Sequence, residues 1–182
     1  MRFVFRLAAA MALPLALTPV AAQAAKSPCL SPAEFSSLAG YALPSVIKGT
    51  SKRCAPTLGA TAFLRSDGDR LATRYSANKG NTWPGAKAAF LKLSGSGNRD
   101  AGDILRKMPD EALQGMLDSV FEGLVAQEIP VERCSTIDSF IRLLSPLPPE
   151  NTAELIALTV GLASHADKTA RVGQLELCPA AK

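Results

Sequence analysis

Residues 109–128, PDEALQGMLDSVFEGLVAQE, are the stretch that decides the fold class. Their apolar side chains recur every three or four residues, which places them on one side of an α-helix. Asp118 and Glu122 fall on the other side, and Asp110 and Glu111 sit where the positive end of a helix dipole favours anions. The apolar set is Leu113, Met116, Leu117, Val120, Phe121, Leu124 and Val125. The stretch predicts an amphipathic helix that packs on a core.

The same helical spacing continues toward the N-terminus. Residues 31–34 (SPAE) form a capping-box pattern, with Ser31 as N-cap and Pro32 at the first helical position. Pro44 is predicted to kink or end this helix, because proline disfavours the α conformation in the residue before it. A continuation over residues 45–52 is expected.

The middle of the chain contains two predicted helices and one predicted loop. A helix is expected from about Pro56 to Tyr75, with an interruption at residues 66–69 (SDGD). Residues 83–85 (WPG) open a short helix. Residues 94–98 (SGSGN) are predicted to be a flexible surface loop by composition.

Two more helices are predicted near the C-terminus. One starts at Ser135, with Asp138 completing a cap-like pair, and the other runs from Asn151 to about Ser164. The connection at 145–149 (SPLPP) is short and rigid, so the pair is expected to pack antiparallel. Residues 155–163 are apolar nearly all round, which predicts burial at the bundle centre. The chain is therefore predicted to be all-α, a single orthogonal or irregular bundle of five to seven helices.

Residues 1–24 have the features of a cleavable secretory signal peptide. Arg2 and Arg6 precede an apolar run over residues 7–22, and residues 22–24 (AQA) match a signal-peptidase site. The run is shorter than the roughly 20 residues that span a bilayer. The Lys-Ser-Pro before Cys29 does not fit a lipoprotein site. Cleavage is predicted to leave a single soluble helical domain, residues 25–182, that is periplasmic or secreted and is not inserted in a membrane.

The charge of the mature chain gives no indication of a polyanionic partner. The full chain has 20 basic and 16 acidic side chains, and Arg2 and Arg6 leave with the leader, so 18 and 16 remain, a net charge of +2. Nucleic-acid binders carry a basic stripe interleaved with aromatic residues, and the basic side chains here are scattered. Nucleic acid is not expected as a partner.

The cysteines at 29, 54, 134 and 178 are the strongest chemical feature. In an oxidising compartment they are candidate disulfides, and four cysteines allow three pairings. Cys29–Cys54 is disfavoured if the helix between them is straight, because about 18 helical residues separate its ends by about 27 Å; a sharp break at Pro44 would remove this objection. Cys29–Cys178 with Cys54–Cys134 is favoured over Cys29–Cys134 with Cys54–Cys178, because chain ends often lie close together. No two cysteines have the close spacing of a zinc motif, so no metal is predicted.

Few other residues point to chemistry. His165, the only histidine, is a candidate general base, but Asp167 lies two residues away and would not face it on a helix. A helix-end histidine near terminal carbonyls is the structural interpretation. Trp83 is either a packing anchor or an exposed ligand contact. Trp83 and His165 are therefore kept as possible ligand contacts, and no catalytic, cofactor-binding or metal-binding residue is predicted.

The chain resembles small exported, cysteine-containing helical proteins of unassigned function from alphaproteobacteria. The residues that carry the resemblance are 29–34 (CLSPAE), 42–44 (ALP), Cys54, Arg74, Tyr75 and 147–151 (LPPEN). The resemblance implies an exported helical protein and transfers no activity.

Three functional hypotheses follow. The leading one is a non-enzymatic protein that binds a protein or another component of the cell envelope. It predicts that Trp83 or another helix face forms an exposed apolar patch larger than a monomer usually carries. The alternatives are a hydrolase of envelope polymers that uses His165 or a pair of acids, and a carrier of a small apolar ligand lined by residues 155–163.

Overall fold

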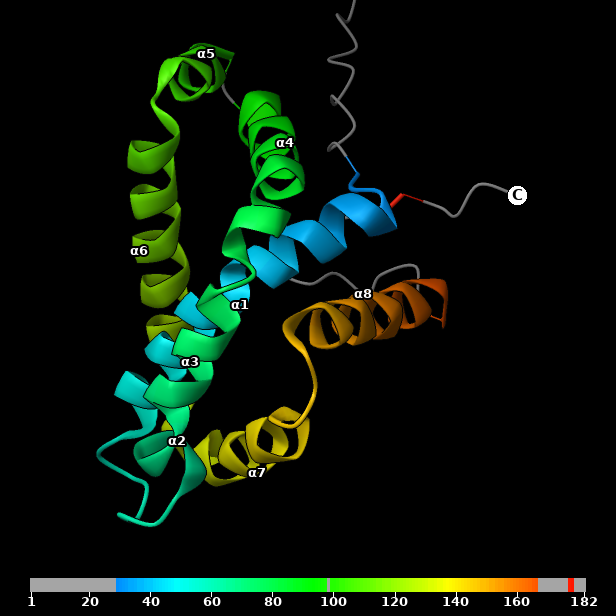
Figure 1. Cartoon of the computed structure of the whole chain (residues 1–182). Helices are drawn as coiled ribbons and strands as arrows, with labels where there is room; N and C mark the ends of the chain where they lie inside the picture. Colours follow the sequence, from blue (N-terminus) through cyan, green and yellow to red (C-terminus); the bar gives the residue numbers. More distant parts are fainter. Residues whose placement is uncertain (1–28, 98, 167–176, 179–182) are drawn as a thin grey trace, which may run out of the picture.

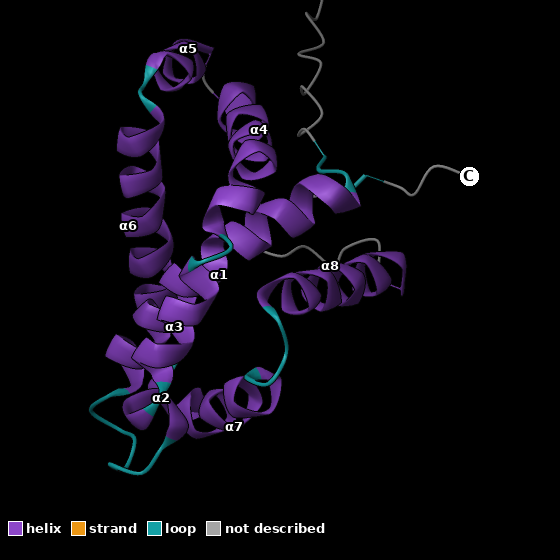
Figure 2. Cartoon of the chain, in the orientation of Figure 1, coloured by secondary structure: helices purple, strands orange, loops and turns teal. Residues whose placement is uncertain are grey.

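The computed structural model describes residues 29–97, 99–166 and 177–178, so the predicted signal peptide lies outside the described residues. Within these ranges the chain forms eight α-helices, a short 3-10 helix and no strand (Figure 1, Figure 2). The elements are α1 Pro32–Cys54, α2 Phe63–Ser66, α3 Gly68–Ser76, α4 Lys79–Gly97, α5 Arg99–Lys107, α6 Asp110–Glu128, η1 Val131–Arg133, α7 Cys134–Leu144 and α8 Pro149–Ala166. The all-α bundle is confirmed, and seven of its helices exceed a single turn.

Helix α1 is the centre of the bundle, and α3, α4, α6 and α8 pack around it (Figure 1). It begins with the predicted capping box: Glu34 N–H donates to Ser31 Oγ at 3.2 Å, and Ser31 N–H donates to the Glu34 carboxylate at 2.8 Å. Helix α1 does not end at Pro44 and continues to Cys54, so the expected continuation over residues 45–52 is confirmed. Proline inside a helix costs about 3 kcal/mol, and burial of α1 by four helices outweighs that cost.

Two glycines of α1 allow its neighbours to approach closely. A Cβ at Gly49 would lie 2.7 Å from the Glu122 carbonyl oxygen of α6, and a Cβ at Gly40 would lie 3.4 Å from the Ala153 Cβ of α8. Helix α6 forms as predicted, with Leu113 and Leu117 buried. Its second half turns the Glu122 backbone toward α1, which leaves Val120 and Leu124 exposed although the periodicity placed them in the core.

The regions of the predicted Pro56 helix and the predicted loop at 94–98 differ from expectation. No helix starts near Pro56; α2 starts at Phe63, and the predicted interruption falls at Asp67, between α2 and α3. Residues 94–97 belong to α4, and Asn98 lies outside the described residues. A Cβ at Gly102 of α5 would lie 3.0 Å from the Gly95 Cα. Gly95 therefore permits close contact between α4 and α5.

Helices α7 and α8 do not form the predicted antiparallel pair. Helix α7 packs on α2 and α8 packs on α1, and Figure 1 shows α7 below α8 with the connection between them. The connection between them is held by α3: the Arg74 guanidinium donates to the Ser145 carbonyl, and Tyr75 Oη donates to the Leu147 carbonyl at 3.2 Å. Tyr75 Oη also lies 2.9 Å from Thr152 Oγ1 at the start of α8. These bonds set the directions of both helices.

Two disulfides join Cys29 to Cys178 and Cys54 to Cys134, the pairs that the sequence analysis favoured. The first ties the chain ends together, and the Cys178 N–H donates to the Leu30 carbonyl at 2.8 Å beside it. The second joins the end of α1 to the start of α7. Among the helices of the described residues, none combines the length and the apolar character that crossing a bilayer requires.

Candidate binding surface

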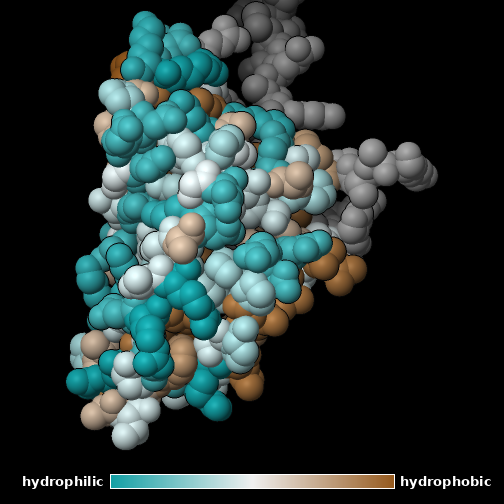
Figure 3. Space-filling model, viewed as in Figure 1, coloured by the Kyte–Doolittle hydropathy of each residue, from teal (hydrophilic) through white to brown (hydrophobic). Residues whose placement is uncertain are grey.

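Five large apolar side chains of α7 and α8 are exposed on one side of the molecule. Their exposed fractions are 58% for Phe140, 69% for Leu143, 40% for Leu155, 59% for Leu158 and 68% for Leu162. We call these five residues the α7–α8 apolar face. In Figure 3, apolar surface runs from α8 toward α7 along the lower right edge of the view. The prediction that residues 155–163 are buried at the bundle centre is therefore wrong.

The exposure of the leucines follows from the side that α8 turns toward α1. Ala153 and Ala157 are buried, and the small side chain of Ala153 fits the close approach at Gly40. Leu155, Leu158 and Leu162 lie on the remaining side of the helix. A sequence signal for this arrangement exists: two alanines four residues apart mark the side of a helix that packs most closely.

Helix α7 is held rigidly at its first turns. Its Cys134 is disulfide-bonded to Cys54, and both are buried. The buried carboxylate of Asp138 accepts hydrogen bonds from Leu64 N–H at 2.7 Å and from Phe63 N–H at 3.3 Å. Asp138 thus caps α2 instead of forming the predicted cap-like pair with Ser135. The anchored helix presents Phe140 and Leu143 in a fixed place.

The other exposed apolar side chains do not extend this surface. Ile104, with an exposed fraction of 64%, lies alone on α5, and Val120 and Leu124 lie together on α6. A typical monomer carries a largest apolar patch of about 300–600 Å². The five residues of the α7–α8 apolar face together expose roughly 500 Å², which is within this range, so the predicted patch larger than a monomer usually carries is not found; a largest patch of this size is often functional.

Trp83 lies in the core between α1, α4 and α6. Only 7% of it is exposed, its ring centroid lies 5.2 Å from that of Tyr41, and its Nε1 donates to the Asp110 carboxylate at 2.8 Å. Hydrogen bonds from Lys87 and Trp83 lower the pKa of Asp110 from its ordinary value. This placement favours the packing anchor over the ligand contact.

A polar cluster joins α1, α4 and α6 beside Trp83. Lys79 pairs with Asp118, which also accepts from Ser45 Oγ at 3.0 Å. The Lys79 ammonium lies 4.4 Å from the centre of the Tyr41 ring. Burial, and then the negative charge of Asp118, raises the pKa of the Tyr41 hydroxyl well above its ordinary range. These groups satisfy one another, so the cluster is a structural seam between helices.

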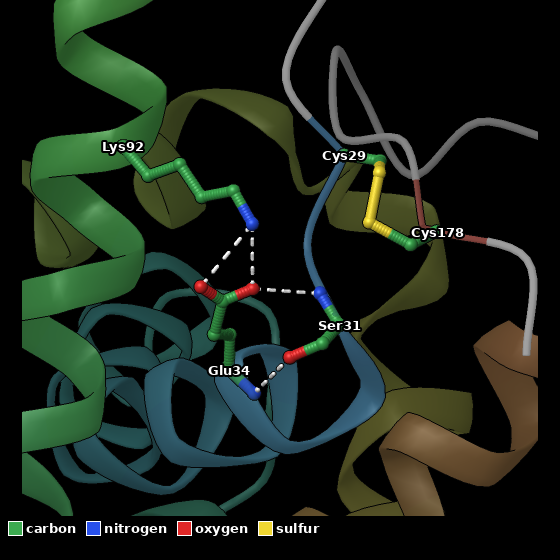
Figure 4. Close-up of a disulfide and its surroundings, with 5 residues drawn as sticks. All are labelled: Cys29, Ser31, Glu34, Lys92 and Cys178. Atoms are coloured by element: carbon green, nitrogen blue, oxygen red, sulfur yellow. Dashed lines mark hydrogen bonds and ion pairs between the residues drawn. A yellow bond between two sulfur atoms is a disulfide. The ribbon is translucent and has the colours of Figure 1, made fainter. Parts of the chain in front are cut away.

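The chain ends meet at a second polar group, shown in Figure 4. Lys92 of α4 donates to both carboxylate oxygens of Glu34, at 2.9 and 3.2 Å, beside the Cys29–Cys178 disulfide. The bond from Lys92 is the main cause that lowers the pKa of Glu34, and the backbone of Ser31 adds to it. This group fixes the first turn of α1 against α4.

The remaining candidate features do not form a catalytic arrangement in the described part of the chain. His165 lies in the last turns of α8, and its side chain is outside the described residues. An open pocket of about 200 Å³ lies between α2, α3 and the end of α7. Of its polar residues, Arg70 pairs with Asp67, and Arg74 donates to the Ser145 carbonyl. Among the described residues, no three metal-binding side chains gather.

Comparisons with known protein families, curated proteins and solved structures found no match. The α7–α8 apolar face is therefore identified from the geometry of this chain alone.

Proposed function

We propose that this protein is an exported, disulfide-stabilised, non-enzymatic interaction protein of the cell envelope that binds a protein partner through the α7–α8 apolar face. One observation carries the proposal: five large apolar side chains, 40–69% exposed, lie on two helices held at fixed positions. Covering such a surface removes apolar area from water at about 25 cal/mol per Å².

The charges around the face favour a protein over a polyanion. The exposed charged residues nearby are Glu132, Arg133 and Arg142 on the α7 side and Glu150 and Glu154 on α8, so basic groups are not in excess. A nucleic acid or an anionic lipid surface would need an excess of basic groups. A protein interface has an apolar centre with a mixed polar rim, which this face matches.

Export is supported by two independent features. Disulfides persist in oxidising compartments such as the bacterial periplasm, and the structure contains two of them. The predicted signal peptide supplies the route. A carrier of small apolar ligands is not proposed, because the leucines expected to line its cavity point to solvent.

Site-specific photo-crosslinking in cells tests the proposed function. A benzophenone amino acid replacing Leu158 should form discrete adducts with protein, because it lies inside the proposed surface. The same amino acid replacing Ile104, which is equally exposed on α5, is the matched control and should form none. Adding Phe140→Glu should remove the adducts of position 158. Equal crosslinking from both positions, or none from position 158, would contradict the proposal.

A further inference from the structure

We propose that the protein covering the α7–α8 apolar face is a second copy of this chain, in a two-fold symmetric dimer with α7 of each copy against α8 of the other. The inference rests on the proposed function, since it names the partner for the same surface.

Each of the two helices has a row of exposed residues along one side, which we call its line, and the α7 line and the α8 line match in spacing and length. On the α7 side, Arg133, Thr136, Phe140 and Leu143 are exposed at intervals of three, four and three residues. On α8, Asn151, Leu155, Leu158 and Leu162 are exposed at intervals of four, three and four. Alternating three- and four-residue intervals are the pattern of helices that interdigitate along a seam. At 1.5 Å per residue each line is about 15–17 Å long.

Within one copy α7 and α8 do not pack on each other, so neither line covers the other although both are exposed on the same side. Helix α7 is held on α2 by Asp138 and by the Cys54–Cys134 disulfide, and α8 is held on α1 through Ala153. A helix from another molecule is therefore needed to cover either line. A two-fold axis covers both at once, because α7 against the partner's α8 implies α8 against the partner's α7.

The charges that start the two lines are opposite in sign; Glu132 is also exposed beside Arg133 but does not fall on the three- and four-residue spacing of the α7 line. Arg133 starts the α7 line, whereas Glu150 and Glu154 flank the start of the α8 line. None of the three makes an ion pair within the described residues. With the two helices parallel across the interface, Arg133 lies beside Glu154 at one end and Leu143 beside Leu162 at the other. Opposite charges at these ends fix the register of the pairing.

The area is sufficient for a dimer of moderate affinity. The apolar face contributes roughly 500 Å² per copy, and a polar rim extends such a surface toward the ~800 Å² per partner of a standard interface. Helices that are already in place lose little entropy on association. The pairing therefore needs no rearrangement of either copy.

Sedimentation velocity of the oxidised chain 25–182, at concentrations from about 1 to about 300 µM, tests the inference over the range of a weak to moderate dimer. The wild type should shift from monomer to dimer as concentration rises. Leu158→Glu places a charge in the apolar seam and should leave a monomer throughout. Ile104→Glu, equally exposed on α5, should dimerise like the wild type. Circular dichroism and thermal unfolding confirm that each variant is folded.

A charge exchange tests the proposed register. Arg133→Glu and Glu154→Arg should each weaken the dimer at least about tenfold, because a two-fold axis repeats every change. The double variant should recover most of the wild-type affinity. A wild type that stays monomeric, a Leu158→Glu variant that still dimerises, or a double variant weaker than both single ones overturns the inference. If the wild type is monomeric but position 158 crosslinks to another protein, the proposed function stands and only the dimer is rejected.

Discussion

Two leucines with the same helical signal have opposite fates in this molecule. Leu117 of α6 is 1% exposed, whereas Leu158 of α8 is 59% exposed. Both lie in apolar sets spaced by three and four residues. Leu117 packs toward α1, and α8 turns its alanines toward α1 instead. The comparison shows that a periodic apolar pattern identifies the sides of a helix that can be buried, but another element decides which side is.

The largest predicted effect on the free energy of unfolding concerns the Cys54–Cys134 disulfide, which joins α7 to the end of α1. Replacing Cys54 and Cys134 by alanine removes a disulfide that closes 80 residues, which the chain-entropy estimate makes worth about 4 kcal/mol. Both sulfurs are buried, so a cavity adds to the loss. Urea unfolding measures the change. The comparison variant is Cys29→Ala with Cys178→Ala, which removes a partly exposed disulfide of sequence separation 149. The chain-entropy estimate makes that bond worth about 5 kcal/mol, so the buried pair exceeds it only through the cavity. A loss below about 1 kcal/mol would show that other contacts hold α7.

The comparison of the two leucines predicts the next effect. Leu117→Ala should lower the free energy of unfolding by about 2–5 kcal/mol, because it leaves a cavity in the core. Leu158→Ala should change it by less than about 0.5 kcal/mol in the monomer, since a solvent-exposed side chain loses little packing. Thermal unfolding at low protein concentration measures both. Similar losses in the two variants would mean that Leu158 is covered within a single copy.

Removal of the Asp138 cap should have a smaller effect. Asp138→Ala leaves Leu64 N–H and Phe63 N–H without their acceptor, and the loss of a helix cap costs about 1–2 kcal/mol. Asp138→Asn keeps one acceptor oxygen and should lose less. Hydrogen exchange of the α2 amides locates the change. If the exchange rates of α2 are the same in Asp138→Ala and the wild type, Asp138 does not act as its cap.

The smallest predicted effect is a dependence of stability on pH at the chain ends. The pKa of Glu34 in the folded state lies below its ordinary value of 4.5, mainly because of Lys92. The contribution of the ionised Glu34 carboxylate to the free energy of unfolding is therefore complete above the pKa of the unfolded state. It is lost as the pH falls through the pKa of the folded state. Lys92→Met should reduce the change in the free energy of unfolding between low and neutral pH, by less than about 1 kcal/mol. Lys48→Met, at an exposed site on α1, should leave that change as in the wild type. Urea unfolding at pH values between about 3 and 7 measures it.

Local signals in the sequence predicted well the features that depend on neighbours in the chain. The capping box at Ser31 and Glu34 forms as predicted, and so do the limits of α6, to within one residue. The predictions failed where distant residues decide. Phe63 starts α2 because Asp138, 75 residues away, accepts its N–H. The glycines at 95 and 102 permit a close crossing of α4 and α5, although the composition of residues 94–98 indicated a loop.

The α7–α8 apolar face was also predicted only in part from the sequence. The sequence supplied its residues, because the leucines of α8 and Phe140 of α7 stand out as apolar positions. It did not supply their exposure, since an antiparallel pair would have buried both sets.

The sequence by itself determined that the chain is helical, where α1 and α7 begin, the bounds of α6 and α8 to within about two residues, and that its cysteines are candidates for disulfides in an exported protein. These features follow from backbone geometry and from side chains a few residues apart. Tertiary structure alone decided that α1 is the central helix, that α7 and α8 pack on different helices, and that the leucines of α8 face outward. The physical reason is steric: Gly40 of α1 leaves room for the small Ala153 side chain of α8, and the contacts of Tyr75 and Asp138 hold the two helices on different neighbours.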